Sequence, residues 1–569
     1  MNIERKNRDF LPNDLTINTW EDLQPFFEDL DKRCIQSKND LERFLKDVSE
    51  LEAVLEEDVA WRYIKMTIDT RDQELSKRYT DFMSNIQPQI SPYDDKFNRK
   101  INDSEFKNDF VGSDFKIYFR GIQNSIELFR ESNIQLLSEL ANDSQEYGAI
   151  TGDQSIELDG EKLTMQKASI KLKDPDRSLR KKVFELIAKR RLEDTDKLES
   201  LFDKLLSKRN QVAKNAGFDN YRDYKFKDLG RFDYSIQDCF DFHESVRSEI
   251  VPIVKELQQK KYALMNLDAI KPYDTDVDPL GRAPLKPFEG GEELLKKSVE
   301  IFAKIDPYFG DCLQTMDNMG HLDLDSKDGK APGGYNYPLY EIGVPFIFMN
   351  SVGAQRDLVT MMHEGGHAVH SFLSRDLNLT GFKSLPSEVA ELASMSMELL
   401  SMDYWDVFYS DKEDLKRAKI EQLETLLSIL PWVATVDKFQ HWLYTNPTNN
   451  KNARSEKWIE INKEFGTGLV DWSGYEDYRK HSWHRQLHIF EVPFYYIEYG
   501  ISQLGAIAVW KNYKEDPSKA VQQYKEALAL GYTKSIPEIY DTAGIQFDFS
   551  KKYISELADF VKSELKKLD

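Results

Sequence analysis

Cysteine is scarce in this sequence. Its 569 residues include only three, Cys34, Cys239 and Cys312, which lie far apart and form no CxxC pair. An odd number of widely separated cysteines gives no disulfide framework, and the missing CxxC spacing gives no sign of a thiolate zinc site. We therefore expect the protein to work in a reducing compartment.

Long hydrophobic runs are also missing. No stretch approaches the roughly 18 apolar residues needed to cross a bilayer, and the amino-terminal MNIERKNRDF has no apolar signal region. We expect a cytoplasmic protein with no membrane partner.

Positive charge is in deficit. The sequence has 77 Lys and Arg against 99 Asp and Glu, a formal net charge of -22. A surface of this sign repels phosphate backbones and anionic lipids. Nucleic acid is therefore not an expected partner.

Apolar residues, by contrast, are plentiful enough for a large core, with 40% hydrophobic and 12% aromatic residues. They recur every three or four positions through most of the first two hundred residues, which predicts helices. Asp159-Gly160 lies between two alternating segments and predicts a β-hairpin, and residues 331–351 carry turn residues and β-formers. The expected fold class is mainly α, with one or two small sheets.

The segment MMHEGGHAVH, residues 361–370, contains the pattern HExxH. On a helix His363 and His367 lie one turn apart, so both imidazoles face one side and can bind one ion. Glu364 lies beside them, where its carboxylate can reach water on the metal. A chain with nine histidines and 99 acidic residues gives about 0.025 such matches by chance. The alternative is a solvated surface helix, but the flanks are apolar on all sides and predict burial.

A catalytic zinc ion needs a third protein ligand and one open position. The next candidates lie in SLPSEVAELASMSMELLSM, where Glu388, Glu391 and Glu398 share one broad helical face. Glu388 follows His367 after 20 intervening residues and Glu391 after 23. Spacing alone leaves both open as the third ligand, beside the alternative that these glutamates are simply solvated.

Histidines and tyrosines gather again in residues 478–505. His488, Tyr495 and Tyr499 are spaced by seven and four, with a new helix expected to start at the intervening proline. Neutral imidazole and phenol groups can donate hydrogen bonds to a developing oxyanion without competing as anions for a metal. We expect this role for His488 and Tyr499, whereas Tyr496 fits an aromatic core.

Together these residues resemble the M3 family of zinc metallopeptidases, in its oligoendopeptidase F-like branch. The similarity runs through residues 331–372, EVAELASMSMELL and QLHIFEVPFYYIEYGISQLGA, and covers roughly residues 100 to 560. It implies Glu391 as the third zinc ligand, with Glu388 as the alternative, and Glu398 as a residue that orients a ligand. It also implies the catalytic roles of His488 and Tyr499. A further catalytic tyrosine would be Tyr495 or Tyr496, and the resemblance does not decide between them.

The resemblance further implies an architecture. This is a helical ellipsoid with a deep central substrate channel and the small β-sheets near the zinc site. Residues 1–200 would form an amino-terminal helical domain that supplies part of the channel wall, and residues 201–569 the zinc metallopeptidase domain. The segment 335–350 would hold an extended peptide by strand addition.

The expected activity is a zinc-dependent endopeptidase that hydrolyses internal bonds of short, unfolded oligopeptides, with zinc-bound water as the nucleophile. The alternatives are a zinc carboxypeptidase and an inactive peptide-binding protein. The sequence leaves the cleavage preference and the oligomeric state open. One Zn²⁺ is expected on His363, His367 and Glu391, and the expected catalytic residues are Glu364, which moves the protons, and His488, Tyr499 and Tyr495.

Overall fold

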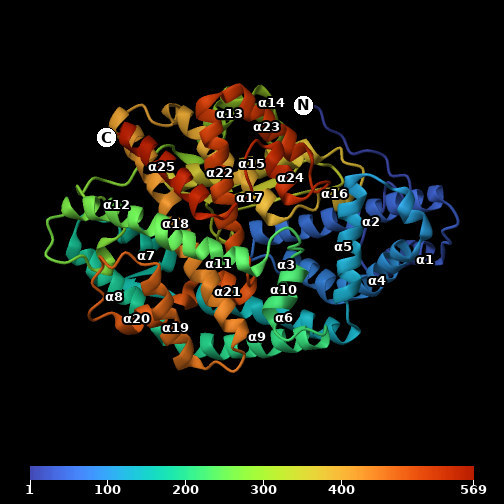
Figure 1. The fold of residues 1–569 in the computed structure, drawn as a ribbon, viewed down its shortest axis with the longest axis horizontal. Coiled ribbons are helices and arrows are strands. Elements are labelled where there is room, and N and C mark those ends of the chain that lie inside the picture. The colour runs from blue at the N-terminus through green and yellow to red at the C-terminus, as the bar shows by residue number, and fades with distance from the viewer. Residues whose placement is uncertain (569) are drawn as a thin grey trace. The chain divides into compact units, whose positions relative to one another are not determined.

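Helices make up most of the molecule. The computed structural model describes residues 1–568, and its helices dominate the ribbon (Figure 1). Helices take up 69% of the chain, and two small sheets are present. The expected mainly-α class is confirmed. The central channel expected from the resemblance stays a prediction.

The chain divides into two compact units, and each is built from three separate segments. Unit 1 contains Met1–Phe129, Lys286–Ala418 and Ser502–Phe547, and unit 2 contains Arg130–Leu285, Lys419–Ile501 and Asp548–Asp569. Each unit therefore combines distant parts of the sequence, and no single boundary in the sequence separates the two units. The domain division at residue 200 stays a prediction.

Unit 1 holds the following elements: α1 (Gln24–Lys32), α2 (Lys38–Ile68), α3 (Gln73–Asp81), α4 (Gln87–Asp103), α5 (Ser113–Leu128), α13 (Gly290–Ile305), α14 (Pro307–Met319), β3 (Leu322–Asp325), β4 (Tyr335–Tyr337), β5 (Phe346–Ser351), α15 (Gln355–Ser374), α16 (Thr380–Lys383), α17 (Ser387–Ser401), α23 (Pro517–Ala529) and α24 (Ile536–Thr542). Short 3-10 and π turns extend or join several helices of the chain.

Unit 2 holds α6 (Glu131–Gly152), β1 (Ser155–Leu158), β2 (Glu161–Thr164), α7 (Met165–Lys171), α8 (Arg177–Glu193), α9 (Thr195–Asn215), α10 (Tyr221–Asp228), α11 (Ile236–Ser245), α12 (Val251–Ala263), α19 (Lys451–Glu464), α20 (Glu476–Lys480), α21 (Leu487–Glu491) and α25 (Lys551–Leu568). Two helices continue from one unit into the other along the sequence, α18 (Lys412–Thr445) and α22 (Tyr496–Glu515).

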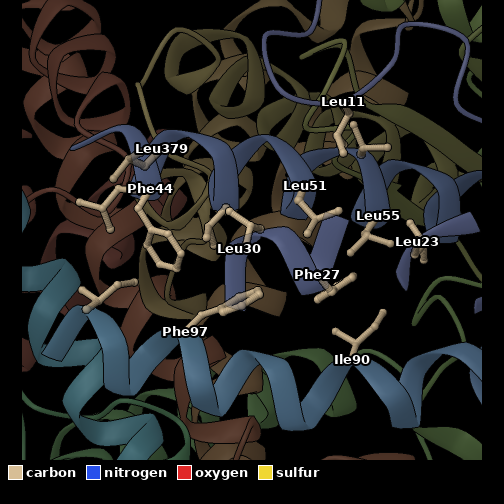
Figure 2. Packing of buried hydrophobic residues seen from close by; sticks show 14 of the residues in the cluster. Leu11, Leu23, Phe27, Leu30, Phe44, Leu51, Leu55, Ile90, Phe97 and Leu379 are labelled. Atoms are coloured by element: carbon tan, nitrogen blue, oxygen red, sulfur yellow. The ribbon is translucent and has the colours of Figure 1, made fainter. Parts of the chain in front are cut away.

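The amino-terminal helices of unit 1 share one hydrophobic core. Ser37 caps α2, because its hydroxyl accepts a hydrogen bond from the Asp40 N–H at 3.2 Å. Figure 2 shows Phe27 of α1 and Phe97 of α4 facing each other inside this core, with ring centroids 5.9 Å apart. Leu379, which precedes α16, joins the same cluster. The first and second segments of unit 1 are therefore held together by buried apolar side chains.

Both predicted sheet segments form. β1 and β2 pair as an antiparallel hairpin, and Asp159 and Gly160 turn the chain with φ of 53° and 87°. Positive φ at both central residues is the geometry that an Asp-Gly hairpin signal predicts. In unit 1 the strand order is β3-β5-β4, with β5 parallel to β3 and antiparallel to β4. β5 is almost fully buried and leads directly into α15.

Candidate active site

The HExxH pattern lies in the middle of α15, and the start of this helix is fixed by a carboxylate. Asp357 Oδ2 accepts hydrogen bonds from the N–H groups of Val352 at 2.8 Å and Ala354 at 3.0 Å. Along the helix Met361 and Met362 are completely buried. The motif is thus held in a rigid, apolar environment, and its polar side chains require specific partners.

Two imidazoles and one carboxylate come together between α15 and α17. Glu391 Oε2 lies 3.3 Å from His363 Nε2 and 3.8 Å from His367 Nε2. Ligand atoms about 2.0–2.1 Å from a tetrahedral zinc ion lie about 3.3 Å apart, so this donor set fits such an ion. The two imidazoles keep about a fifth of their surface exposed, which leaves the site accessible for a further ligand. Glu388 lies one turn earlier in α17, outside this group.

Further polar groups orient the three side chains. Glu398 Oε1 lies 2.7 Å from His363 Nδ1. This carboxylate can accept a hydrogen bond from the Nδ1–H group, which turns Nε2 toward the metal position. His367 hydrogen-bonds to the backbone of Ala390. Ser394 donates a hydrogen bond to Glu391 Oε2 at 3.0 Å. The donor atoms are therefore positioned by α17 before any ion binds.

The surroundings shift the pKa values of Glu364, His367 and His363 in different directions. Burial raises the pKa of Glu364 to about 7, whereas burial lowers the pKa of His367 to about 4. Burial also disfavours the charged form of His363, but the carboxylates of Glu391 and Glu398 outweigh it and raise its pKa well above the usual value. Glu364 can thus exchange a proton near neutral pH, and His367 is neutral, as a metal ligand must be. His363 carries a second proton without metal, and an ion bound at Nε2 would displace it.

The two glycines of HEGGH allow neighbouring elements to come close. A Cβ on Gly366 would lie 2.7 Å from Ser394 Cα and 2.8 Å from the Ala393 carbonyl oxygen, both in α17. A Cβ on Gly365 would lie 2.4 Å from the ring of Phe302 in α13. All three distances are far below an ordinary contact. The α15 and α17 helices can therefore pack at this separation only because residue 366 has no side chain.

His370, the last histidine of the segment, differs from the other two. Its side chain is fully enclosed, and it packs toward the backbone of Leu528 in α23. Burial lowers its pKa to about 3, so the imidazole is neutral. These surroundings fit a structural role.

The second group of predicted residues lies in unit 2. His488 belongs to α21, and its ring centroid lies 5.7 Å from that of Tyr499 and 6.0 Å from that of Tyr495. Tyr496 is the nearest of the three tyrosines, at 4.8 Å, and is buried. Gln486 Nε2 lies 2.7 Å from His488 Nδ1. One imidazole and three phenol rings therefore form a single cluster.

A strained corner precedes these tyrosines. Phe494 has φ of 69°, a conformation that costs a side chain of this size about 1–3 kcal/mol. Its N–H donates to Gln440 Oε1 at 2.7 Å, and its carbonyl accepts a hydrogen bond from Arg231. Arg231 also pairs with Glu498 Oε1 at 2.8 Å. These buried contacts hold the corner from which Tyr495 and Tyr499 project.

Comparison with known families places the chain. The profile of peptidase family M3 matches residues 170–559, and that of the peptidase M3 N-terminal domain matches residues 10–129. The chain belongs to peptidase family M3. Within this family it is oligoendopeptidase F-like.

Relatives of this M3 peptidase agree with that placement. The oligoendopeptidase F homolog of Borreliella burgdorferi is 22% identical over 73% of this chain and 68% of its own length. Oligopeptidase PepF of Bacillus subtilis is 23% identical over 52% of this chain and 44% of its own length.

Solved structures share the fold over nearly the whole chain. Pz peptidase A, solved with an inhibitor, is 25% identical, with a TM-score of 0.91 over 100% of this chain and 99% of that one. Oligoendopeptidase F from Enterococcus faecium is 16% identical and shares the fold, with a TM-score of 0.66 over 96% of this chain and 97% of its own.

The family is one of metal-dependent peptidases that hydrolyse peptide bonds, so this M3 peptidase is a metallopeptidase acting on peptides. Within residues 1–568, no helix is both long and apolar enough to span a bilayer.

Two contacts of the M3 peptidase had no signal in the sequence. Asn336 of β4 donates a hydrogen bond to the Glu364 carbonyl oxygen at 3.2 Å and so ties the sheet to the motif helix. Arg231 meets Glu498 although 267 positions separate them. Neither pair has a helical or strand spacing, so no local pattern relates them.

Proposed function

We propose that this M3 peptidase is a zinc-dependent endopeptidase that cuts internal bonds of short, unfolded oligopeptides. The observation that carries the proposal is the meeting of His363 Nε2, His367 Nε2 and Glu391 Oε2 within 4.8 Å of one another, beside Glu364 on the same helix. These three side chains would hold the ion, and Glu391 rather than Glu388 is the third ligand. The free thiols of all three cysteines support the prediction of a reducing, cytoplasmic location.

When bound, zinc would supply a Lewis acid that polarises the scissile carbonyl and makes water a better nucleophile. Glu364 accepts a proton from the attacking water and delivers it to the leaving amine nitrogen. Burial raises the pKa of Glu364 to about 7 without metal, which supports both steps, because this carboxylate takes up a proton near neutral pH more readily than a solvated glutamate does.

The remaining residues position groups or donate hydrogen bonds. Glu398 holds His363 in the tautomer whose Nε2 binds metal. His488 and Tyr499 donate hydrogen bonds to the oxyanion that forms on the substrate, and Tyr495 is a further donor. Donors of this type contribute about 2–4 kcal/mol to the stabilisation of a transition state. Tyr496 packs in the aromatic cluster.

The substrate main chain would add to the sheet of unit 1. β4 is an edge strand in the order β3-β5-β4, and Asn336 links it to the motif helix. An extended peptide paired with β4 would be held through its backbone, which suits peptides of varied sequence. Substrates N-methylated at single backbone positions test this step. We expect an alternating rise in KM along the peptide, and a uniform KM would contradict strand addition.

Peptides with both ends blocked separate the endopeptidase from a carboxypeptidase. An endopeptidase continues to cut them internally, whereas a carboxypeptidase requires a free terminal carboxylate. Mass spectrometry of the fragments from peptides of graded length gives the answer. Exclusive removal of single carboxyl-terminal residues would overturn the proposal.

Chelation separates both enzymes from an inactive peptide-binding protein. Removal of metal should abolish hydrolysis, and added zinc should restore it. Binding of peptide without hydrolysis in the zinc-loaded protein would favour the inactive alternative.

A further inference from the structure

A second group of metal-ligating side chains lies in unit 2, between α11 and α18. Cys239 and His243 are four residues apart on α11, and Asp437 and His441 are four residues apart on α18. A four-residue step brings two side chains to one face of a helix, so each helix presents a pair to the other. Ligand atoms of Cys239, Asp437 and His441 lie within 4.8 Å of one another. Two facing helices of this kind commonly build metal sites in helical proteins.

These side chains are removed from solvent. All four are at most 3% exposed, and the ring of Phe240 covers His441 at a centroid distance of 4.9 Å. Asp437 Oδ1 and the Nδ1 atoms of His243 and His441 have no hydrogen-bond partner among residues 1–568. Leaving polar atoms buried and unpaired is unfavourable. A cation bound at this point would give some of them a partner.

We propose that Cys239, Asp437 and His441 bind a divalent transition-metal ion of the zinc type. One thiolate and one carboxylate neutralise the two positive charges of the ion, so the site carries no net charge in an apolar surrounding. Sulfur, nitrogen and oxygen ligands together favour zinc over calcium or magnesium. His243 Nε2 lies 2.8 Å from Asp437 Oδ2 and holds this carboxylate in place.

The site is structural rather than catalytic. Its ligands are buried, so substrate cannot reach the ion. Asp437 Oδ1, which is buried without a hydrogen-bond partner in the described chain, would fill the fourth position of a closed site, and such a site joins protein elements instead of activating water. The ion would cross-link α11 to α18 within unit 2. The ring of His441 also lies 5.4 Å from that of Phe494, the strained residue that precedes Tyr495. The cross-link would therefore also support the corner that carries the His/Tyr cluster.

Cobalt substitution tests the site in the full chain. A thiolate bound to Co²⁺ gives a charge-transfer band in the near ultraviolet. The ligands proposed for the HExxH site include no thiolate, so the band reports a cysteine outside that site. We expect two Co²⁺ per wild-type chain together with this band. A His363→Ala/His367→Ala chain should retain one Co²⁺ and the complete band. This variant also separates the two proposals, because failure of the HExxH site leaves the band unchanged.

Matched cysteine variants control for unspecific binding. Cys239→Ser should lose the band and one Co²⁺ equivalent, whereas Cys34→Ser, which removes an exposed thiol, should keep both. His243→Ala should weaken cobalt binding about 10- to 100-fold, as the loss of a group that orients a ligand does. A band that persists in Cys239→Ser would overturn the proposal.

If Cys239→Ser fails to fold, thermal unfolding of a variant that leaves Cys239, Asp437 and His441 intact tests the proposal instead. In the His363→Ala/His367→Ala chain, zinc should raise the Tm and a chelator should lower it again. A folded chain of this variant that neither binds a metal equivalent nor shows a zinc-dependent Tm would overturn the proposal.

Discussion

Gly366→Ala is the substitution that tests most directly how the site is built. The new Cβ would lie 2.7 Å from Ser394 Cα, whereas ordinary contacts begin at 3.4 Å. Because the opposing atoms are backbone, no side-chain rotation relieves the clash, and α15 and α17 must separate by about 0.7 Å. Overpacking of this kind costs about 1–3 kcal/mol of stability.

The same displacement should also weaken metal binding. Glu391 belongs to α17, three residues before Ser394, so it moves away from His363 and His367 with the helix. Metal sites tolerate deviations of only about 0.2 Å in ligand distance. We expect zinc affinity to fall by about 10- to 100-fold, with a parallel loss of peptidase activity at limiting zinc.

Chelator competition measures the affinity, and thermal unfolding of the zinc-free protein measures the stability. Gly121→Ala in α5 is the matched control, because a Cβ at this position meets nothing within 4 Å. The control should leave zinc affinity unchanged and stabilise its helix by up to about 1 kcal/mol. If Gly366→Ala behaves like Gly121→Ala, the argument that residue 366 sets the spacing of the two helices is wrong.

Other substitutions separate the roles of the site residues. Glu364→Gln should keep bound zinc but lower kcat by about 10²- to 10⁴-fold, and near-normal turnover would contradict its role as the base. In the wild type kcat/KM should fall as the pH drops through the pKa of Glu364, which is about 7 without metal and lower beside a bound cation, because only the ionised carboxylate accepts a proton. A flat pH profile from pH 8 to about pH 5 would count against this assignment. Glu398→Gln should weaken zinc binding about 10- to 100-fold by equilibrium dialysis, and unchanged affinity would show that the contact with His363 is incidental. Tyr499→Phe should lower kcat about 10²- to 10³-fold with little change in KM, whereas a change confined to KM would assign the phenol to substrate binding.

The sequence predicts best what depends on local spacing. His363 and His367 share a helical face because they are four residues apart, and Asp159-Gly160 forms its hairpin because both residues accept positive φ. The choice between Glu388 and Glu391 is different, since both lie on one face of α17. It depends on how α17 packs against α15, which the residues alone leave open.

Contacts between distant segments have no such signal. The packing partners of the two glycines, Ser394 and Phe302, come from other helices, so the sequence could show only that a helix contains unfavourable residues. Cys239 and His441 lie about two hundred positions apart. The α11 helix carries only the cysteine ligand, and α18 carries the other two proposed ligands. Few cysteines and no CxxC spacing therefore gave no sign of a thiolate site, although α11 and α18 bring Cys239 and His441 together.

Glu391 and Glu398, which contact His363, lie with it within a span of 36 residues from α15 to α17. His488 and Tyr499 follow about a hundred residues later and belong to unit 2. On the proposed assignment, a chain could therefore lose the hydrogen-bond donors to the oxyanion and still bind zinc on α15 and α17. Metal content is accordingly a poor measure of competence in this protein. Batches or variants should be graded by active-site titration with a transition-state analogue, which counts only those molecules in which both sets of residues are in working order.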